Sequence, residues 1–401
     1  MSGSGRGRAA ALVVAGATVA ACTSGPEDAS TPASTDAVPS ATAEPGGADG
    51  SDDDGADDPD DDRTQDGADG PEVAEPGVLA TGLRSPWGLT FLPDGDALVT
   101  ERDTARILRI SPDGEVTEAA VVPGVAHGGE GGLLGIAADP EDPANVYVYA
   151  TTDEDNRVIR LRFDDGELDS GHLRVQEVVL EGIPHHPQRH NGGRLAFGPD
   201  GFLYVASGDA DDRSAAQDLD SLAGKILRVD RDGDPAAGNP TSDSPVWSLG
   251  HRNVQGLGWI PSGEDAGTMV ASEFGQDTWD ELNRIEPGEN YGWPQVEGDG
   301  GGAEYTDPLL TWRPADASPS GIAVTEEEVY VAALRGESLW RVPLDGADVG
   351  EPERLLAGEY GRLRAAEVDS AGQLWLLTSN TSRGAPAPED DRIVVVDPDD
   401  L

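Results

Sequence analysis

One repeated unit dominates the sequence and restricts the folds that the chain can adopt. Each copy contains a small residue, an apolar strand, a turn, a second apolar strand, another turn and an alternating third strand. The copies begin, roughly 45 to 65 residues apart, at Trp87, Leu134, Gly193, Gln255, Ser320 and Leu363. Six such units predict an all-β, six-bladed β-propeller, in which every blade packs against its neighbours. A β-sandwich is the competing all-β fold, but it does not explain six similar units.

Small residues open the units where the innermost strands of a propeller approach its axis. Five of these positions are Gly88, Gly135, Gly193, Gly256 and Gly321. A propeller also brings loops from every blade to one end of a central channel, so polar residues far apart in sequence can meet there. We therefore expect residues 77–401 to form one propeller domain with a functional site at the mouth of the channel.

The first 22 residues have the pattern of an export signal. Arg6 and Arg8 precede a run of apolar and small residues, 9–20, that is too short to span a bilayer comfortably. The run ends in the string VAAC, which resembles the lipobox of bacterial lipoproteins, and Cys22 is the only cysteine. An ordinary signal peptide with a chance cysteine is the alternative. We expect lipidation at Cys22, and hence an extracytoplasmic protein anchored to the outer face of the bacterial cell membrane.

An acidic segment separates this signal from the repeats. Residues 23–76 are rich in Ser, Thr, Pro, Ala, Gly and Asp and hold 17 acidic residues against one base, Arg63. Such a composition cannot bury enough apolar surface to fold, so we expect a disordered, acidic tether. Of the formal net charge of −50, about −36 remains on residues 77–401, which hold 60 acids and 24 bases. A field of this sign argues against nucleic acid and against direct docking on anionic lipid.

Four strings in the repeats occur in one order: HNGGRLAFGPDGFLYVASGD, GKILRVDRDG, LGHRNVQGL and NYGWP. Together they make residues 77–401 resemble the soluble aldose (glucose/sorbosone) dehydrogenases that depend on pyrroloquinoline quinone (PQQ). The resemblance implies oxidation of aldose sugars at C1 to the lactone, by base-assisted hydride transfer from the sugar to the quinone. It also implies PQQ and Ca²⁺ as cofactors.

The resemblance assigns roles to four residues of these strings. His190 matches the catalytic base, which suits an imidazole because its ordinary pKa lies near the operating pH. Asp209 matches the carboxylate that orients this histidine. Arg252 matches the guanidinium beside the quinone carbonyls, where negative charge develops, and Asn253 matches a neighbouring cofactor contact. Taken singly, His190 would be an ordinary loop histidine and Arg252 a surface ion pair.

Four further positions fall where the family binds the cofactor. Arg362 and Arg364 match an R-x-R pair and could clamp a PQQ carboxylate. Arg335 falls where the family commonly has lysine, so a fork of donors replaces a point charge. Glu130 falls where relatives have a glutamine that touches both sugar and cofactor, and its charge would oppose the PQQ carboxylates.

The resemblance also implies two calcium sites. Backbone carbonyl ligands at the cofactor match Gly275 and Gln276, and oxygen ligands of this kind suit a hard cation. A second, structural site matches Glu281 and Tyr291, although Glu281 could simply face solvent. Trp312 could stack on the cofactor or the sugar, or belong to the core.

Two other functions remain open from the sequence. A metal-dependent propeller lactonase or hydrolase would need several carboxylates around one channel metal. A non-catalytic extracellular binding propeller would not need the combination of His190, Asp209, Arg252 and the later arginines. We expect a small-molecule sugar as substrate, with the membrane reached only through Cys22. The natural sugar, the electron acceptor and the choice between a monomer and a homodimer stay open.

Overall fold

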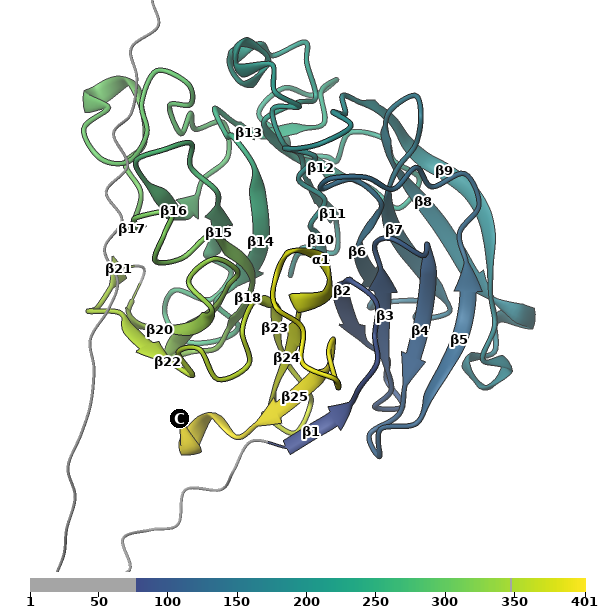
Figure 1. Ribbon diagram of the computed structural model, residues 1–401. Coiled ribbons are helices and arrows are strands. Elements are labelled where there is room, and N and C mark those ends of the chain that lie inside the picture. Colours follow the sequence, from purple (N-terminus) through teal and green to yellow (C-terminus); the bar gives the residue numbers. More distant parts are fainter. Residues whose placement is uncertain (1–76, 347) are drawn as a thin grey trace, which may run out of the picture. The chain divides into compact units, whose positions relative to one another are not determined.

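A computed structural model describes residues 77–346 and 348–401, which form six antiparallel β-sheets arranged as the blades of a propeller (Figure 1). The predicted six-bladed, all-β fold is therefore confirmed. The predicted signal peptide, the lipidation site at Cys22 and the acidic tether lie outside the described residues. Within the described part of the chain, no helix has the length and apolar character needed to cross a membrane.

In the first four blades, each a sheet of four strands, the strands follow one another in sequence from the channel outward, and blade 5 has a fifth strand that pairs with its third. The first three blades contain β2 (Pro86–Phe91), β3 (Ala97–Glu101), β4 (Arg106–Ile110) and β5 (Val116–Val121); β6 (Leu133–Ala138), β7 (Asn145–Thr151), β8 (Asn156–Phe163) and β9 (Leu173–Ile183); and β10 (Leu195–Phe197), β11 (Leu203–Ala206), β12 (Lys225–Val229) and β13 (Val246–Leu249). Blades 4 and 5 contain β14 (Val254–Trp259), β15 (Met269–Glu273), β16 (Asp280–Ile285) and β17 (Leu310–Trp312); and β18 (Pro319–Val324), β19 (Glu328–Ala333), β20 (Ser338–Asp345), β21 (Asp348–Val349) and β22 (Glu353–Leu355).

The sixth blade is completed by both ends of the described chain. It contains β23 (Leu363–Val368), β24 (Leu374–Thr378), β25 (Ile393–Val396) and β1 (Gly77–Ala80). β1 is the outermost strand and pairs antiparallel with β25, with Gly77 opposite Val395. The repeat pattern did not predict this closure, which covers the edge of β25 and joins the first segment to the last.

The helical turns are short and lie between strands or at the C-terminal end. They are η1 (Asp164–Gly166), η2 (Leu168–Ser170), η3 (Arg213–Gln217), η4 (Gly302–Glu304), α1 (Asn380–Arg383) and η5 (Pro398–Asp400). Of these, α1 and η3 concern the functional site. α1 brings Arg383 to the central cavity, and η3 belongs to the loop that follows Asp209.

Six apolar clusters hold the ring together, one between each pair of adjacent blades. Burying a large apolar side chain stabilises a fold by about 1.5–3 kcal/mol, so neighbouring blades stabilise each other strongly. Trp312 belongs to the cluster between blades 4 and 5, with its ring centroid 5.9 Å from that of Trp340. It does not line the central cavity, so of its two predicted roles the structure supports core packing.

Glycines let the innermost strands pass close to one another around the axis. A Cβ atom on Gly135 would lie 2.2 Å from the carbonyl oxygen of Gly193, and one on Gly256 would lie 2.5 Å from that of Ser320. Real Cβ atoms do not approach backbone this closely, so any larger residue would push adjacent blades apart. The expected crowding at these positions is confirmed.

Candidate active site

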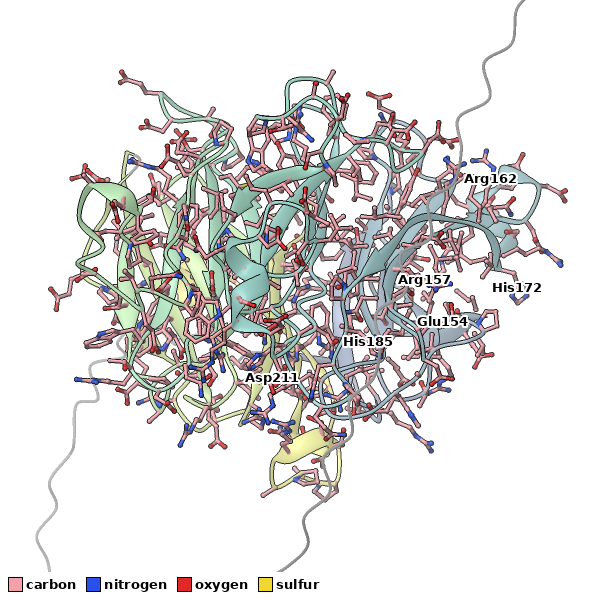
Figure 2. The ribbon with its side chains drawn as sticks, turned by 90° about the horizontal axis from the view of Figure 1, so that it is seen from above. Glu154, Arg157, Arg162, His172, His185 and Asp211 are labelled. Carbon is pink, nitrogen blue, oxygen red and sulfur yellow. The ribbon has the colours of Figure 1, made fainter. Side chains whose placement is uncertain are left out.

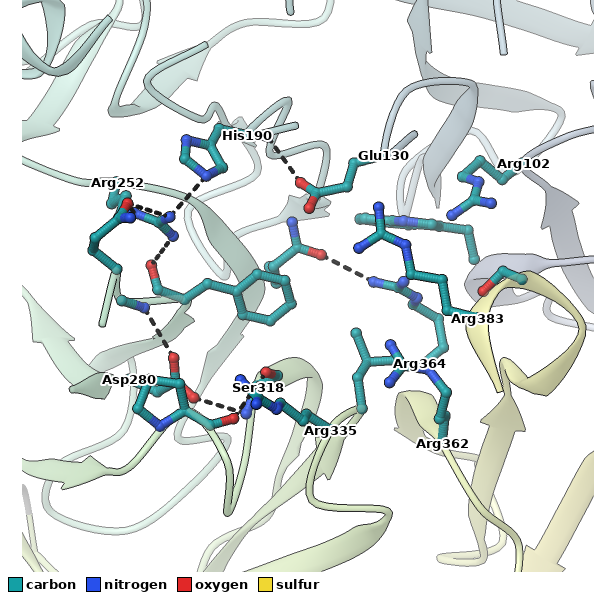
Figure 3. A pocket seen from close by; sticks show the side chains of 18 residues that line it. Arg102, Glu130, His190, Arg252, Asp280, Ser318, Arg335, Arg362, Arg364 and Arg383 are labelled. Carbon is teal, nitrogen blue, oxygen red and sulfur yellow. Dashed lines mark hydrogen bonds between the residues drawn. The ribbon is translucent and has the colours of Figure 1, made fainter. Parts of the chain in front are cut away.

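A cavity of about 420 Å³ opens at one end of the channel, among loops from different blades (Figure 3). Its lining is unusually rich in arginine for a protein with this excess of acid. The charged residues and the histidine that line it are Arg102, Glu130, His190, Arg252, Asp280, Arg335, Arg362, Arg364 and Arg383. The cavity thus brings together every predicted arginine of the site and the predicted base.

His190 and Asp209 form a buried pair at this cavity. His190 precedes β10, and Asp209 follows β11, the next strand of the same blade. The distance from His190 Nδ1 to Asp209 Oδ1 is 2.7 Å. The other carboxylate oxygen, Oδ2, accepts a hydrogen bond of 2.8 Å from Trp293 Nε1. Asp209 is fully buried, and both of its oxygens are therefore fixed.

The protonation state of Asp209 follows from these partners. Burial alone would raise its pKa. The hydrogen bond and charge of His190 oppose this effect, as do the hydrogen bonds from the Asp211 backbone and Trp293, and the net result is a pKa below the usual value. Asp209 is therefore a carboxylate at neutral pH and can stabilise a positive charge on the imidazole.

Arg252 determines which nitrogen of His190 is free of a proton. Its Nη2 lies 2.8 Å from His190 Nε2, and a guanidinium can only donate. Nε2 must then accept, which places the imidazole proton on Nδ1, where it is donated to Asp209. The histidine is thus held in the tautomer whose unprotonated nitrogen faces the cavity, as a base requires.

Arg252 itself is held by the segment that follows β15. Its guanidinium donates to Gln276 Oε1 from Nη2, at 2.7 Å, and to the backbone carbonyl of Phe274 from Nη1, at 3.1 Å. Its backbone N–H donates to the carboxylate of Glu273. Burial lowers the pKa of Arg252, and the negative charges of Asp209 and Glu130 oppose that shift. The guanidinium therefore stays charged and fixed beside the base.

Glu130 and Asn253 support the base from the other side. Glu130 Oε2 accepts hydrogen bonds from the backbone N–H of His190, at 2.8 Å, and from Asn253 Nδ2, at 3.3 Å. Glu130 lines the cavity, whereas Asn253 is fully buried behind it. The predicted cofactor contact of Asn253 stays a prediction, and in this structure the residue positions Glu130.

Arg362 and Arg364 lie on the opposite side of the cavity, at the start of β23. Arg364 is only 7% exposed, and its Nη1 donates to Gln255 Oε1 at 3.1 Å and to Ser320 Oγ at 3.2 Å. Among the described residues, no partner exists for the buried Nε of either arginine. Burial, followed by the charges of neighbouring arginines, lowers the pKa of Arg364 well below its usual value. Unpaired, desolvated cations of this kind favour an anionic ligand.

The indole of Trp87 on β2 also lines the cavity. Two guanidinium groups lie near its ring, that of Arg364 at 5.5 Å from the centroid and that of Arg194 at 4.4 Å. Cations stack favourably on the face of an indole. Trp87 and Arg364 thus bring a planar surface and a positive charge to the cavity lining, while Arg194 stacks on the indole without lining the cavity.

The comparisons with known proteins show the family to which this chain belongs. The sequence model of the Glucose / Sorbosone dehydrogenase family matches residues 83–385. The chain belongs to this family. The structure of the PQQ-bound form of aldose sugar dehydrogenase from Streptomyces coelicolor is 51% identical, with a TM-score of 0.75, and the match covers 80% of this chain and 96% of that one.

Two further relatives of this sugar dehydrogenase are also named as oxidoreductases. A structure described as a putative oxidoreductase (glucose dehydrogenase) from Thermus thermophilus is 43% identical, with a TM-score of 0.73, and the match covers 80% of this chain and 98% of that one. Aldose sugar dehydrogenase YliI from Escherichia coli is 29% identical over 339 residues, which is 76% of this chain and 90% of that protein.

Three charged residues of the dehydrogenase cavity were missed by the sequence analysis. Arg102 follows β3 and pairs with Asp103, Nε to Oδ1 at 2.7 Å, while Arg383 ends α1. Asp280 begins β16 and accepts hydrogen bonds from the backbone N–H groups of Gly275 and Ser318. Burial raises the pKa of Asp280 to about 6. No repeat or motif marks these residues, and only the fold places them at the cavity.

The predicted calcium ligands fall in two places in this dehydrogenase. Gly275 and Gln276 line the cavity, next to Asp280. Glu281 is buried beside it on β16, where burial and then the charge of Glu273 raise its pKa to about 8. The Tyr291 hydroxyl donates to the Arg284 carbonyl and accepts from the Glu286 N–H, which leaves its backbone carbonyl as the better candidate ligand.

One orphaned atom supports a cation near Glu281. Asn283 Nδ2 donates to Glu281 Oε2 at 3.0 Å, while Asn283 Oδ1 is buried and has no hydrogen-bond partner in the described part of the chain. A carboxylate and a free amide oxygen are ligands that Ca²⁺ accepts. Within residues 77–346 and 348–401, however, no group of three or more His, Cys, Asp or Glu side chains is arranged to hold a metal ion. Any cation here would need backbone carbonyls or water as further ligands.

The other histidines have no place in the cavity lining. Figure 2 shows His172 at one outer edge of the dehydrogenase. His251 is fully buried and hydrogen-bonded to Ser248 and to Glu273, each at 2.8 Å. These contacts fit a structural role for His251.

Proposed function

We propose that this sugar dehydrogenase oxidises aldoses at C1 to the lactone, with PQQ as the electron acceptor in the site. The single observation that carries the proposal is the pairing of His190 with Asp209 and Arg252 at the arginine-rich cavity. A base with its free nitrogen fixed toward the cavity can remove the proton of a sugar hydroxyl. The arginines supply the charge that an anionic cofactor needs.

The residues present fit PQQ, a planar tricarboxylate. The buried, unpaired Nε atoms of Arg362 and Arg364 are donors that a carboxylate would satisfy. Arg335 also lines the cavity, so three guanidinium groups are available for three carboxylates. Trp87 offers a flat surface for the ring system. When bound, the quinone supplies a carbon that accepts the hydride and hence two electrons.

Each charged residue near the base would then have one role in the oxidation. His190 Nε2 accepts the proton of the C1 hydroxyl, which takes the place of the Arg252 N–H as donor to this nitrogen. Asp209, held ionised by its partners, stabilises the resulting imidazolium. The freed Nη2 of Arg252 is then available to stabilise negative charge that develops on the acceptor. Glu130 can accept hydrogen bonds from other sugar hydroxyls.

Calcium is the second proposed cofactor. Backbone carbonyls of Gly275 and Gln276 would hold the ion beside the cofactor, and Asp280, whose Oδ1 accepts the Gly275 N–H at 2.9 Å, is a candidate carboxylate ligand. A nearby cation would favour the ionised form of Asp280 and offset the effect of burial on its pKa. Glu281, Asn283 and the Tyr291 carbonyl form the proposed structural site.

Reconstitution tests this proposal. Purified apoprotein is expected to reduce a dye with aldoses as electron donors only after PQQ and Ca²⁺ have both been added. Calorimetry should show PQQ binding, and lactone should appear in proportion to the dye reduced. Omission of each cofactor in turn is the control. Absence of both PQQ binding and dye reduction would contradict the proposed function.

The alternatives give different outcomes in the same assay. A propeller lactonase would consume lactone without an electron acceptor, but six arginines and only two carboxylates line the cavity, which is a poor ligand set for a catalytic metal. A binding propeller would bind sugar without dye reduction. The pairing of a free imidazole nitrogen with a buried carboxylate favours the oxidoreductase over both.

We also propose that the enzyme is a lipoprotein held at the outer face of the cell membrane through Cys22, and that it meets its sugar and its electron acceptor there. Replacement of Cys22 by serine is expected to move the protein from the membrane fraction to the soluble fraction, since no other lipid attachment site is predicted. Immunoblots of both fractions measure the effect, with Ser24→Ala as the matched control. Membrane retention of the Cys22→Ser protein would show that another anchor exists.

A further inference from the structure

The chain contains a single lysine among 26 arginines, and this lysine is completely buried. Lys225 begins β12, the third strand of blade 3. All of the other lysine or arginine positions hold arginine. The single lysine therefore indicates that the donor geometry needed at this position is one that a guanidinium does not provide. An ammonium is a compact point donor with three hydrogens, whereas a guanidinium is a planar fork.

The ammonium group of Lys225 is fully used by backbone carbonyls. Nζ donates to the carbonyl oxygens of Ala215, at 2.7 Å, Ala216, at 3.1 Å, and Ala223, at 2.7 Å. No carboxylate among the described residues forms an ion pair with it. All three acceptors belong to residues 210–224, the loop that runs from Asp209 to β12 and includes η3. Lys225 therefore ties the middle of this loop, at Ala215 and Ala216, to its C-terminal end at Ala223.

The same loop supports two segments of the active site. The carbonyl of Ala216 accepts the N–H of Gly250 at 3.0 Å, and that of Gly224 accepts the N–H of His251 at 3.2 Å. These contacts fix the backbone immediately before Arg252.

The second segment carries Trp293. Gln217 Nε2 donates to the Trp293 carbonyl at 2.7 Å and to Asn290 Oδ1 at 2.9 Å. Trp293 in turn donates to Asp209. The loop that Lys225 holds thus begins directly after Asp209. It supports the segments that carry Arg252 and Trp293, which contact His190 and Asp209.

The charge of Lys225 does not favour folding. Burial lowers its pKa to about 8, with a small opposing effect from Asp218. A base whose pKa is lower in the folded than in the unfolded state destabilises the fold at neutral pH, and this effect is relieved as the pH rises from about 8 toward the ordinary value. Keeping a charged lysine here despite that penalty argues for a role in the site.

We propose that Lys225 is a positioning residue for the reaction, which sets the places of Arg252 and Trp293, and through them the His190–Asp209 pair, by holding the 210–224 loop. The inference rests on the proposed function. Lys225→Met keeps the length of the side chain and removes the donors. Lys225→Arg keeps the charge and changes the shape of the donor group.

Both variants are expected to fold and to lose at least about tenfold in kcat when saturated with PQQ, Ca²⁺ and sugar, with a sugar KM within about threefold of the parent. Hydrogen exchange should become faster in residues 210–224 and also at 250–253. The matched control is Leu227→Ala on the same strand, which opens the core between blades 2 and 3. It should lower Tm while kcat stays at the parental value.

A parental kcat in Lys225→Met, whatever its Tm, would overturn the proposal and leave Lys225 with a structural role only. A variant that does not fold would be decided by Lys225→Arg. If the parent protein itself binds no PQQ and oxidises no aldose, the proposed function fails. The exchange data at 250–253 then still show whether Lys225 positions the Arg252 segment.

Discussion

Replacing His190 with alanine is expected to lower kcat by at least about 100-fold, typical for loss of a positioned general base, while PQQ remains bound. The reason is the arrangement of its two ring nitrogens. Nδ1–H is committed to Asp209 and Nε2 is the acceptor that faces the cavity. Without the ring, no other described residue offers an unprotonated nitrogen at this place. Steady-state kinetics with a saturating sugar and a PQQ titration measure the two effects.

Backbone strain must be separated from the loss of the base. His190 has a φ of 56°, in the left-handed region that alanine adopts less readily than asparagine. His190→Asn should therefore fold at least as well as His190→Ala and be equally slow. His185→Ala, in the same segment but outside the cavity lining, is the control and should retain parental kinetics. Turnover at the parental rate in His190→Asn would show that His190 is not the base.

Arg364→Ala should weaken PQQ binding by about one and a half to three and a half decades. Arg364 is buried beside Arg362, and a PQQ carboxylate bound there would be desolvated. Loss of one partner of a buried, charge-assisted pair costs about 2–5 kcal/mol, and each decade in Kd corresponds to about 1.4 kcal/mol. Titration of both proteins with PQQ at fixed Ca²⁺ measures the difference.

Although Arg364→Ala should weaken PQQ binding, it should not lower the stability of the apoprotein. Burial and the neighbouring arginines lower the pKa of Arg364. Its positive charge therefore destabilises the folded protein when no anion is bound. The Tm of the Arg364→Ala apoprotein is therefore expected to equal or exceed that of the parent. Arg174→Ala, an exposed partner of Asp164, is the control and should leave PQQ affinity unchanged. An unaltered Kd for Arg364→Ala would remove this arginine from the cofactor site.

The sequence predicts the fold well because each blade repeats the same local pattern. Alternating strands, turn residues and the glycines at Gly135 and Gly256 are local features whose consequences are the same in every copy. The closure of blade 6 by β1 is not local, since it pairs the first described strand with the last one. Nothing in the four residues of β1 marks β25 as their partner.

The site residues likewise include some that sequence motifs identify and others that only the fold brings to the cavity. His190, Asp209 and Arg252 lie in extended motifs, so a resemblance could identify them before any coordinates were known. Arg102 lies in the turn after β3 and Arg383 at the end of α1. No motif marks either residue, and their approach to the cavity depends on the packing of blades 1 and 6. The contact of Arg252 with His190 Nε2, which fixes the tautomer, likewise depends on distances that no motif encodes.

The closure of blade 6 has a consequence for how the chain could be rearranged. Since β1 and β25 are adjacent and paired, the two ends of the domain lie side by side on one blade (Figure 1). A short linker could join residue 401 to residue 77, and new termini could be opened in an exposed turn of another blade. Such a circular permutant would keep all six sheets and the cavity. The point at which a tether or an electrode is attached could then be moved around the ring without changing a residue of the active site.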